Sequence, residues 1–291
     1  MEIDITKHVS QLLAEYDPKS PETTADALRS LWVKFEPKSI EGIKAEQRQL
    51  QETVGIPIPV LKVISKQIAK IARKRVADFI PLSRLLWERY GRVGRVVASP
   101  VLGAMERTDP DTILPLLMLL CRSCFTWEDC DRLAMDALEP IVRKQPDKWL
   151  TSIEPWLEDD NKWLRRAGIT VVGRLAMKHP AFTRRCLGLT EKLLWDEDLD
   201  VKRAVSFAIR ISVRGELEPV LEFMQRNIPP EDPAATWVLC DVIRSMGKAF
   251  LVNFTPLLPV YEQWLSDPSI NPRERKSIQS AIRTLESASS I

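Results

Sequence analysis

The sequence is short of glycine, histidine and long apolar runs, and each shortage excludes a class of protein. Only 10 of its 291 residues are glycine, and neither a GxGxxG nor a Walker-type run occurs, so we expect no nucleotide cofactor. The two histidines, His8 and His179, are remote in sequence and indicate no Ser-His or Cys-His nucleophile. No apolar run approaches the roughly 20 residues that span a bilayer, and the first residues lack the apolar core of a signal peptide. These absences favour a cytoplasmic protein without a membrane partner.

The five cysteines indicate neither a disulfide framework nor a zinc site. An odd number scattered through helical sequence favours reduced thiols in a cytosolic setting. Cys121 and Cys124 form a CxxC pair with Cys130 nearby, but a structural zinc site needs four ligands, and no histidine or second CxxC lies close. We therefore expect no metal and interpret these cysteines as small buried residues of helices.

Helical periodicity is present almost throughout the chain. Apolar residues recur every three or four positions, and the 21 prolines are expected to mark helix starts and turns rather than helix interiors. The pattern favours an all-α protein, a right-handed α-solenoid of HEAT-like repeats with a concave, basic inner surface. We expect one domain over 1–291, with a helical N-terminal cap at 1–55, repeats at 56–250 and a C-terminal helical pair at 251–291.

A near-repeat supports this organisation and aligns cations between neighbouring repeats. Residues 158–169 and 195–207 each join an acidic, helix-starting stretch to two adjacent cations, at an offset of 37 residues. The cations that align are Arg165-Arg166 and Lys202-Arg203. Because the net charge is only +2, any nucleic-acid binding has to come from a local basic face of this kind.

The helix expected at 198–214 divides into two faces. Small and branched apolar residues form the packing face, and the opposite face gathers Arg203, Ser206, Phe207, Arg210 and Arg214. Cations on one face repel unless an anion or acidic neighbours lie opposite, so this face favours a nucleic-acid surface. The alternative is a solvated face with Phe207 packed into the next helix. The basic segment 62–75 also has two interpretations, a phosphate-facing surface or a run of solvated lysines.

One aromatic–carboxylate pair stands out as a candidate for chemistry. Trp127 and Asp131 are spaced i, i+4, so a helix would place them on one face one turn apart. A carboxylate beside a large ring stabilises a developing cation, which suits glycosidic cleavage through an oxocarbenium-like transition state. The alternative is that Trp127 packs in the core while Asp131 pairs with a surface arginine. Other tryptophans sit mostly at core spacing and are expected to pack: Trp32, Trp87, Trp149, Trp156, Trp195, Trp237 and Trp264.

Together these segments resemble the AlkD-type DNA alkylation repair proteins, a family of HEAT-like-repeat DNA glycosylases. Trp127-x-x-x-Asp131 is similar to the family's tryptophan and catalytic aspartate, and DNKWLRR at 160–166 resembles its DxxWLRR stretch, which supplies a DNA-contacting arginine. KRAVSFAIR at 202–210 resembles its K-A-I-G-W-x-L-R helix, and VGIPIPVLKVISKQIAK at 54–70 resembles its early G-x-x-x-P-x-L-R-x-I-x-K segment. The likeness covers roughly residues 50–250, and the order and spacing of all four motifs carry it.

The resemblance implies excision of cationic N3- or N7-alkylated purines from double-stranded DNA. Asp131 would stabilise the oxocarbenium-like sugar and position a water, while Trp127 and Phe207 would contact the deoxyribose and exclude solvent. The DNA backbone would be held by Lys162, Arg165, Arg166, Lys202, Arg203 and Arg210. A monomer is the default for an array with polar caps, and a bacterial protein of this kind would associate with the nucleoid.

One position departs from the family pattern, and two alternatives stay open. Phe207 stands where the family's helix has a second tryptophan, so the aromatic face is smaller and lacks the indole N–H. This change favours a non-catalytic HEAT-repeat protein that binds damaged or branched DNA, with salt-dependent binding and no excision. A protein–protein scaffold, the commonest use of such arrays, would have no DNA affinity.

Overall fold

The computed structural model describes residues 4–35, 56–105 and 110–289, and the regular structure in these ranges is helical, without strands. The predicted all-α repeat fold is confirmed. The chain divides into two compact units, Met1–Lys144 and Gln145–Ile291. The single domain remains a prediction, and part of the predicted N-terminal cap, 36–55, lies outside the described residues.

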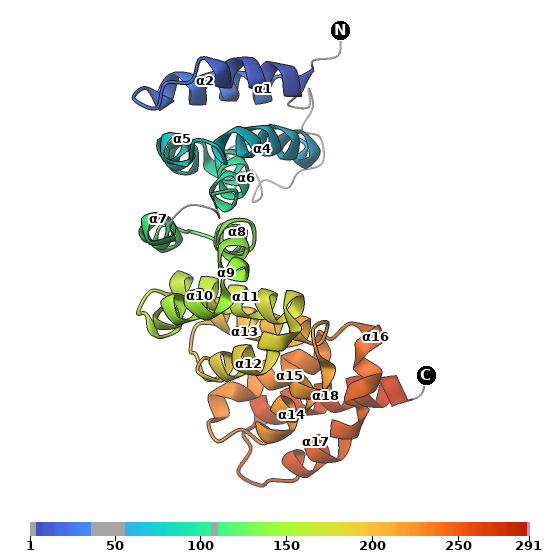
Figure 1. Ribbon diagram of the computed structural model, residues 1–291. Coiled ribbons are helices and arrows are strands. Elements are labelled where there is room, and N and C mark those ends of the chain that lie inside the picture. Colours follow the sequence, from blue (N-terminus) through green and yellow to red (C-terminus); the bar gives the residue numbers. More distant parts are fainter. Residues whose placement is uncertain (1–3, 36–55, 106–109, 290–291) are drawn as a thin grey trace. The chain divides into compact units, whose positions relative to one another are not determined.

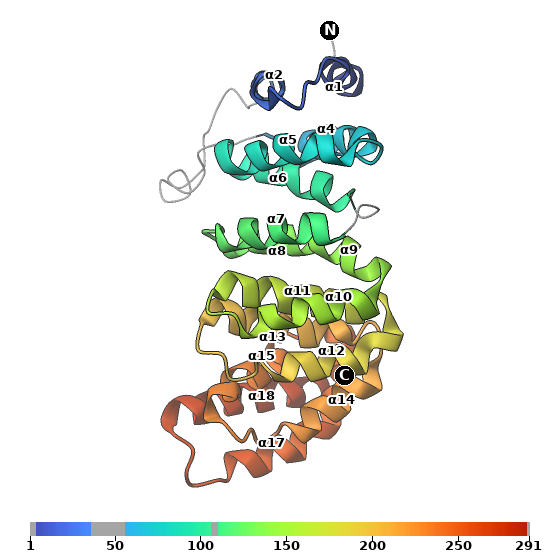
Figure 2. The same ribbon diagram turned by 60° about the vertical axis from the view of Figure 1, so that its left-hand side comes forward.

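The first unit is built from helices that pack in two layers (Figures 1 and 2). Its elements are α1 (Ile5–Ala14), α2 (Pro21–Val33), α4 (Ile58–Ala72), α5 (Val76–Arg89), α6 (Gly91–Gly103), α7 (Pro110–Arg122), α8 (Trp127–Leu133), the π-helical η1 (Ala134–Leu138) and α9 (Glu139–Lys144). In one layer α1 packs on α4, α4 on α6, and α6 on α8 and η1, while in the other α2 packs on α5. Each helix therefore buries its apolar face against its neighbours in the stack.

The second unit repeats this arrangement. Its elements are α10 (Pro146–Ile153), η2 (Glu154–Glu158), α11 (Lys162–Lys178), η3 (Pro180–Phe182), α12 (Thr183–Glu191), α13 (Leu199–Ser212), α14 (Leu217–Arg226), η4 (Pro233–Ala235), α15 (Thr236–Arg244), α16 (Lys248–Leu251), η5 (Val252–Leu257), α17 (Leu258–Leu265) and α18 (Pro272–Ser289). One layer stacks α11 on α13, α13 on α15 and α15 on α18, and in the other α12 packs on α14.

Caps and one close approach fix the two helices that carry the near-repeat. The Asn161 side chain caps α11 by accepting hydrogen bonds from the N–H groups of Trp163 and Leu164. Asp198 caps α13 by accepting a hydrogen bond from the N–H of Asp200 at 2.8 Å. A Cβ on Gly173 would lie 2.5 Å from the Cα of Ala208. Only glycine therefore allows α11 and α13 to approach this closely.

Pro21, Pro146 and Pro272 start helices as predicted, but other prolines do not. Pro81, Pro100 and Pro115 lie inside α5, α6 and α7 rather than at helix starts. An internal proline removes one backbone hydrogen bond and clashes with the preceding turn, at a cost of about 3 kcal/mol. Packing of α5 and α6 between their neighbours offsets this cost, and such tertiary packing cannot be read from local sequence.

The predicted core is confirmed for five of the seven tryptophans, while Trp237 is only half-buried. Trp32, Trp87, Trp149, Trp156 and Trp264 are buried. Trp195 is exposed over 47% of its surface, so the expectation of packing is wrong for this residue. The cysteines are free and buried as expected, and burial raises the pKa of the Cys121 thiol well above its ordinary value.

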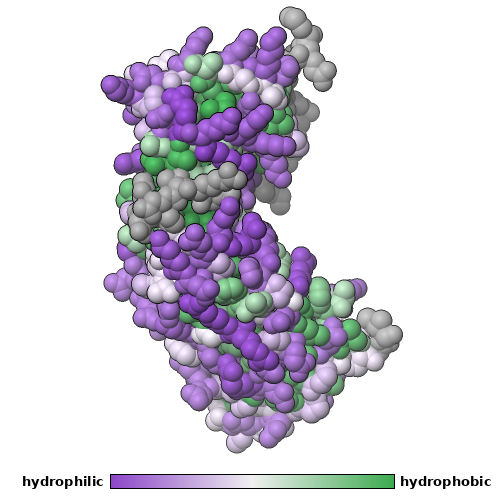
Figure 3. All heavy atoms as spheres, viewed as in Figure 1, coloured by the Kyte–Doolittle hydropathy of each residue, from purple (hydrophilic) through white to green (hydrophobic). Residues whose placement is uncertain are grey.

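The described surface is largely hydrophilic. In Figure 3 polar side chains cover most of the face in view, with smaller apolar patches between them. Within the described ranges, no helix combines the length and the apolar character required to cross a bilayer.

Candidate functional site

Helix α8 carries the predicted aromatic–carboxylate pair. Trp127 is its first residue, follows the N-cap Thr126, and exposes 55% of its surface. Asp131 lies one turn further along the same helix and is half-buried. The i, i+4 spacing therefore forms a helical turn, and the alternative of a core Trp127 is wrong. The exposed Trp127 ring thus lies on the helix face that also carries the Asp131 carboxylate.

An ion pair and a reciprocal cap hold the beginning of α8. Thr126 Oγ1 accepts from the N–H of Asp129 at 3.3 Å and donates to its Oδ2 at 3.0 Å. Asp129 Oδ2 also accepts a hydrogen bond from Nη1 of Arg95 at 2.5 Å. The Arg95 guanidinium lies 5.4 Å from the ring centroid of Trp87 and 5.8 Å from that of Phe125. This network orders the backbone from which the Trp127 ring projects.

A second set of ion pairs holds Glu128, the residue that follows Trp127 on α8. Arg92 donates to Glu128 through Nη2 at 2.8 Å and Nε at 3.1 Å, and Arg132 donates to the same carboxylate at 3.1 Å. Burial alone would raise the pKa of Glu128, but the two arginines outweigh it and lower that pKa. Glu128 therefore stays ionised and bridges α6 to α8.

The helix widens directly after α8. Residues 134–138 form the π-helical segment η1, three residues beyond Asp131. A Cβ on Gly103 would lie 2.0 Å from the carbonyl oxygen of Asp136, so α6 accommodates the widened turn only because this residue is glycine. Such π segments recur at functional sites.

The partners of α8 differ in how visible they are in the sequence. The Thr126-x-x-Asp129 spacing is a capping-box signal that could have been found. Arg92 and Arg95 lie 36 and 34 residues before the acids they bind, and no local pattern joins them.

The predicted DNA-binding Arg165 on α11 is bonded within the protein. Its Nε donates to Oδ2 of Asp196 at 2.6 Å, and its Nη2 donates to Oδ1 at 3.3 Å. Its Nη1 donates to the main-chain carbonyls of Asp159 and Asp160 at 2.8 and 3.0 Å. The side chains of Arg165 and Asp196 are only 18% and 5% exposed. Arg165 thus ties α11 to the acidic segment that precedes α13.

Lys162 and Arg166 also contact that acidic segment. The Lys162 ammonium lies 2.9 Å from Asp200 and 3.3 Å from Asp198, and the hydrogen bond to Asp200 raises its pKa. Arg166 is buried and donates through Nη1 to the main-chain carbonyl of Asp200. The acids of the second copy therefore bind the cations of the first.

The equivalent cations of α13 differ. Arg203 is exposed and Lys202 half-buried, and neither side chain has a hydrogen-bond or ion-pair partner among the residues that the structure describes. Their full charge is available to an anion.

Phe207 and Arg210 lie together on α13. Phe207 is half-buried, and the Arg210 guanidinium carbon is 5.9 Å from its ring centroid. Arg210 also donates to the Ser245 carbonyl at 3.1 Å, and burial lowers its pKa although Asp241 opposes this. Ser206 lies on the same face as Arg210, whose Nε donates to its hydroxyl at 3.4 Å, but it is buried there and donates to Asp241 at 2.7 Å.

The structure groups the predicted residues by unit. Trp127 and Asp131 share α8 in the first unit, and the predicted DNA-binding cations lie with Phe207 on α11 and α13 of the second. In the described ranges, no cluster of three histidine, cysteine or acidic side chains could hold a metal ion.

Comparison with known proteins adds one finding. A family model described as DNA alkylation repair enzyme matches residues 27–235, a stretch that includes every predicted site residue. No curated protein matches the sequence.

Proposed function

The chain belongs to the DNA alkylation repair enzyme family, and on that premise we propose that it is a DNA glycosylase releasing cationic N3- or N7-alkylated purines from duplex DNA. The observation that best supports the proposal is the exposed Trp127 ring one turn from the Asp131 carboxylate on α8. A cleft shared by residues 127, 131 and 207, lined by a concave basic surface, remains a prediction.

The proposed chemistry needs no protonation of the base. An alkylated purine is already positively charged, so cleavage of its bond to C1′ returns the electron pair to the ring and releases a neutral base. Positive charge then develops on the sugar, where Asp131 stabilises it and accepts a proton from the water that adds to C1′. Trp127 offers the negative face of its ring to the same cation and excludes bulk water.

Two roles follow for the second unit under this proposal. Lys202 and Arg203 hold backbone phosphates, because no protein group neutralises them among the described residues. Phe207 supplies a second aromatic contact to the deoxyribose. Lys162, Arg165, Arg166 and Arg210 remain proposed DNA contacts, with the added task of joining neighbouring helices.

A base-release assay tests the proposal. We expect Asp131→Asn to reduce release of 7-methylguanine from methylated DNA at least about 100-fold while duplex affinity stays within about threefold, since the charge acts mainly in the transition state. Asp136→Asn, an acid on the adjoining η1 segment, is the matched control and should change release less than about threefold. A wild-type protein that releases no alkylated base would contradict the glycosylase.

One observation favours a second candidate, a non-catalytic protein that binds damaged or branched DNA. The Phe207 ring is smaller than the family's tryptophan and lies against Arg210. In that case the wild-type protein binds duplex DNA in a salt-dependent manner without release. Phe207→Trp would then leave release undetectable.

A further inference from the structure

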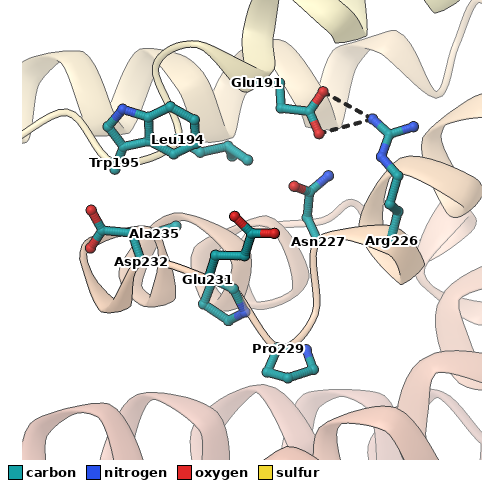
Figure 4. A pocket seen from close by; sticks show the side chains of 10 residues that line it. Glu191, Leu194, Trp195, Arg226, Asn227, Pro229, Glu231, Asp232 and Ala235 are labelled. Atoms are coloured by element: carbon teal, nitrogen blue, oxygen red, sulfur yellow. Dashed lines mark hydrogen bonds and ion pairs between the residues drawn. The ribbon is translucent and has the colours of Figure 1, made fainter.

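A cavity of about 550 Å³ lies within the second unit, between the end of α12 and the segment that follows α14 (Figure 4). Trp195, Glu191, Arg226, Pro229, Glu231 and Asp232 are among the residues that line it. No residue assigned above to DNA or chemistry is among them. Its volume falls in the range of ligand sites, about 300–1,000 Å³.

Trp195 gives this cavity an open aromatic wall. It lies in the connection between α12 and α13, and 47% of its surface is exposed. The exposed part of the indole is accessible to a molecule in the cavity that it lines. Tryptophan also binds cations through its ring face more strongly than the other aromatics do.

The wall opposite the indole is anionic. Glu191 is neutralised by Arg226, whose Nη2 donates to its two oxygens at 3.0 and 3.1 Å. Glu231 and Asp232 have no cationic partner among the described residues, and one Asp232 oxygen accepts only from the N–H of Ala234 at 2.8 Å. In Figure 4 these two carboxylates lie across the cavity from the Trp195 ring.

This charge arrangement selects the class of ligand. Two uncompensated carboxylates repel phosphate, so the cavity does not suit a DNA strand. A cation between the ring and the acids is attracted by the ring face on one side and by the carboxylates on the other. Guanidinium fits better than ammonium, because it is planar, weakly hydrated, stacks on aromatic faces and donates two parallel hydrogen bonds to a carboxylate.

We propose that this cavity is a docking site for an arginine side chain of a partner protein, which stacks on Trp195 and donates hydrogen bonds to Glu231 and Asp232. The cavity volume leaves room for residues beside that arginine, and Pro229 provides an apolar wall for them. The site is separate from the proposed glycosylase residues and does not depend on base excision.

Calorimetric titration of the full chain at low salt tests the site, with a capped Gly-Arg-Gly-Arg-Gly peptide as the probe. The arginine peptide should bind more tightly than its lysine counterpart, and a glutamate counterpart should not bind. Trp195→Ala and Glu231→Gln should each weaken binding about 3- to 30-fold, the range for a lost cation–ring contact or charge-assisted hydrogen bond. Both variants should remain folded, because Glu231 is exposed and Trp195 is buried over only about half of its surface.

Glu262→Gln on α17 is the matched control, because it removes an exposed carboxylate of the same unit outside the cavity. Its affinity for the arginine peptide should equal that of the wild type. The proposal is overturned if the wild type fails to bind this peptide, if the lysine peptide binds equally well, or if all three variants lose affinity alike. Trp195→Ala should retain whatever base release the wild type has, so failure of the glycosylase leaves this test intact.

Discussion

The two copies of the acidic-then-basic segment use their charges differently. On α11, Lys162 and Arg165 pair with Asp200 and Asp196, acids of the next copy. On α13, Lys202 and Arg203 have no partner within the described ranges. Glu231 and Asp232, the acids before α15, line the cavity beside Trp195 and pair with neither cation. Equivalent sequence positions thus hold the stack together in one repeat and leave charge available in the next.

The largest predicted effect of this difference between the copies is on the stability of the protein. Arg165→Ala should lower the free energy of unfolding by about 2–4 kcal/mol, because it leaves the buried Asp196 carboxylate without its cation. Arg203→Ala on the aligned helix should change it by less than about 0.5 kcal/mol. Urea unfolding followed by circular dichroism measures both. Equal losses in the two variants would show that the copies do not differ in this way.

A second prediction concerns DNA affinity. Lys202→Ala combined with Arg203→Ala should reduce the slope of log K against log salt by about 1.8, since each phosphate contact contributes about 0.9. Lys162→Ala should change the slope much less, because Asp198 and Asp200 already neutralise this lysine. Fluorescence anisotropy with a labelled duplex across a salt series gives both slopes. A larger change for Lys162→Ala would reverse the proposed assignment of phosphate contacts.

The sequence predicted well whatever depends on local periodicity. The i, i+4 pair Trp127 and Asp131 lies on one helical turn, and the apolar face of 198–214 is the face that packs. The repeat also aligned the cations of α11 and α13 correctly. These features follow from residues a few positions apart, where helix geometry alone decides which side chains are neighbours.

Pairing between repeats could not be predicted in the same way. Arg165 and Asp196 are 31 residues apart, and Arg95 and Asp129 are 34 apart, so their contact depends on how two helices stack. Ser206 lies on the face of Arg210 as its spacing predicts, but its contact with Asp241 of α15 buries it there. Trp195 had core spacing but follows the end of α12, where no neighbour covers its ring fully. Packing decided each of these cases.

The smallest predicted effect is pH-dependent and concerns Asp198, the acid that caps α13. Burial alone would raise the pKa of Asp198, but hydrogen bonds from the Asp200 N–H and from Lys162 outweigh it, so that pKa is lowered. A carboxyl with a lowered folded-state pKa stabilises the protein above its unfolded pKa of about 3.9, and the contribution is lost as pH falls through the folded value.

Asp198→Asn keeps a capping side chain and removes the charge, so it isolates this effect. At pH 7 the variant should be less stable than the wild type by about 0.5 kcal/mol, the scale of a partly exposed ion pair, and the difference should vanish at an acid pH below the folded-state pKa of Asp198. Asp160→Asn, in the first copy, should show no such dependence, because the Asp160 side chain has no partner among the described residues. Urea midpoints for the three proteins at both pH values measure the difference. A gap that persists at low pH would assign the role of Asp198 to its cap rather than to its charge, and the copies would then differ in the pairing of Arg165 and Lys162 alone.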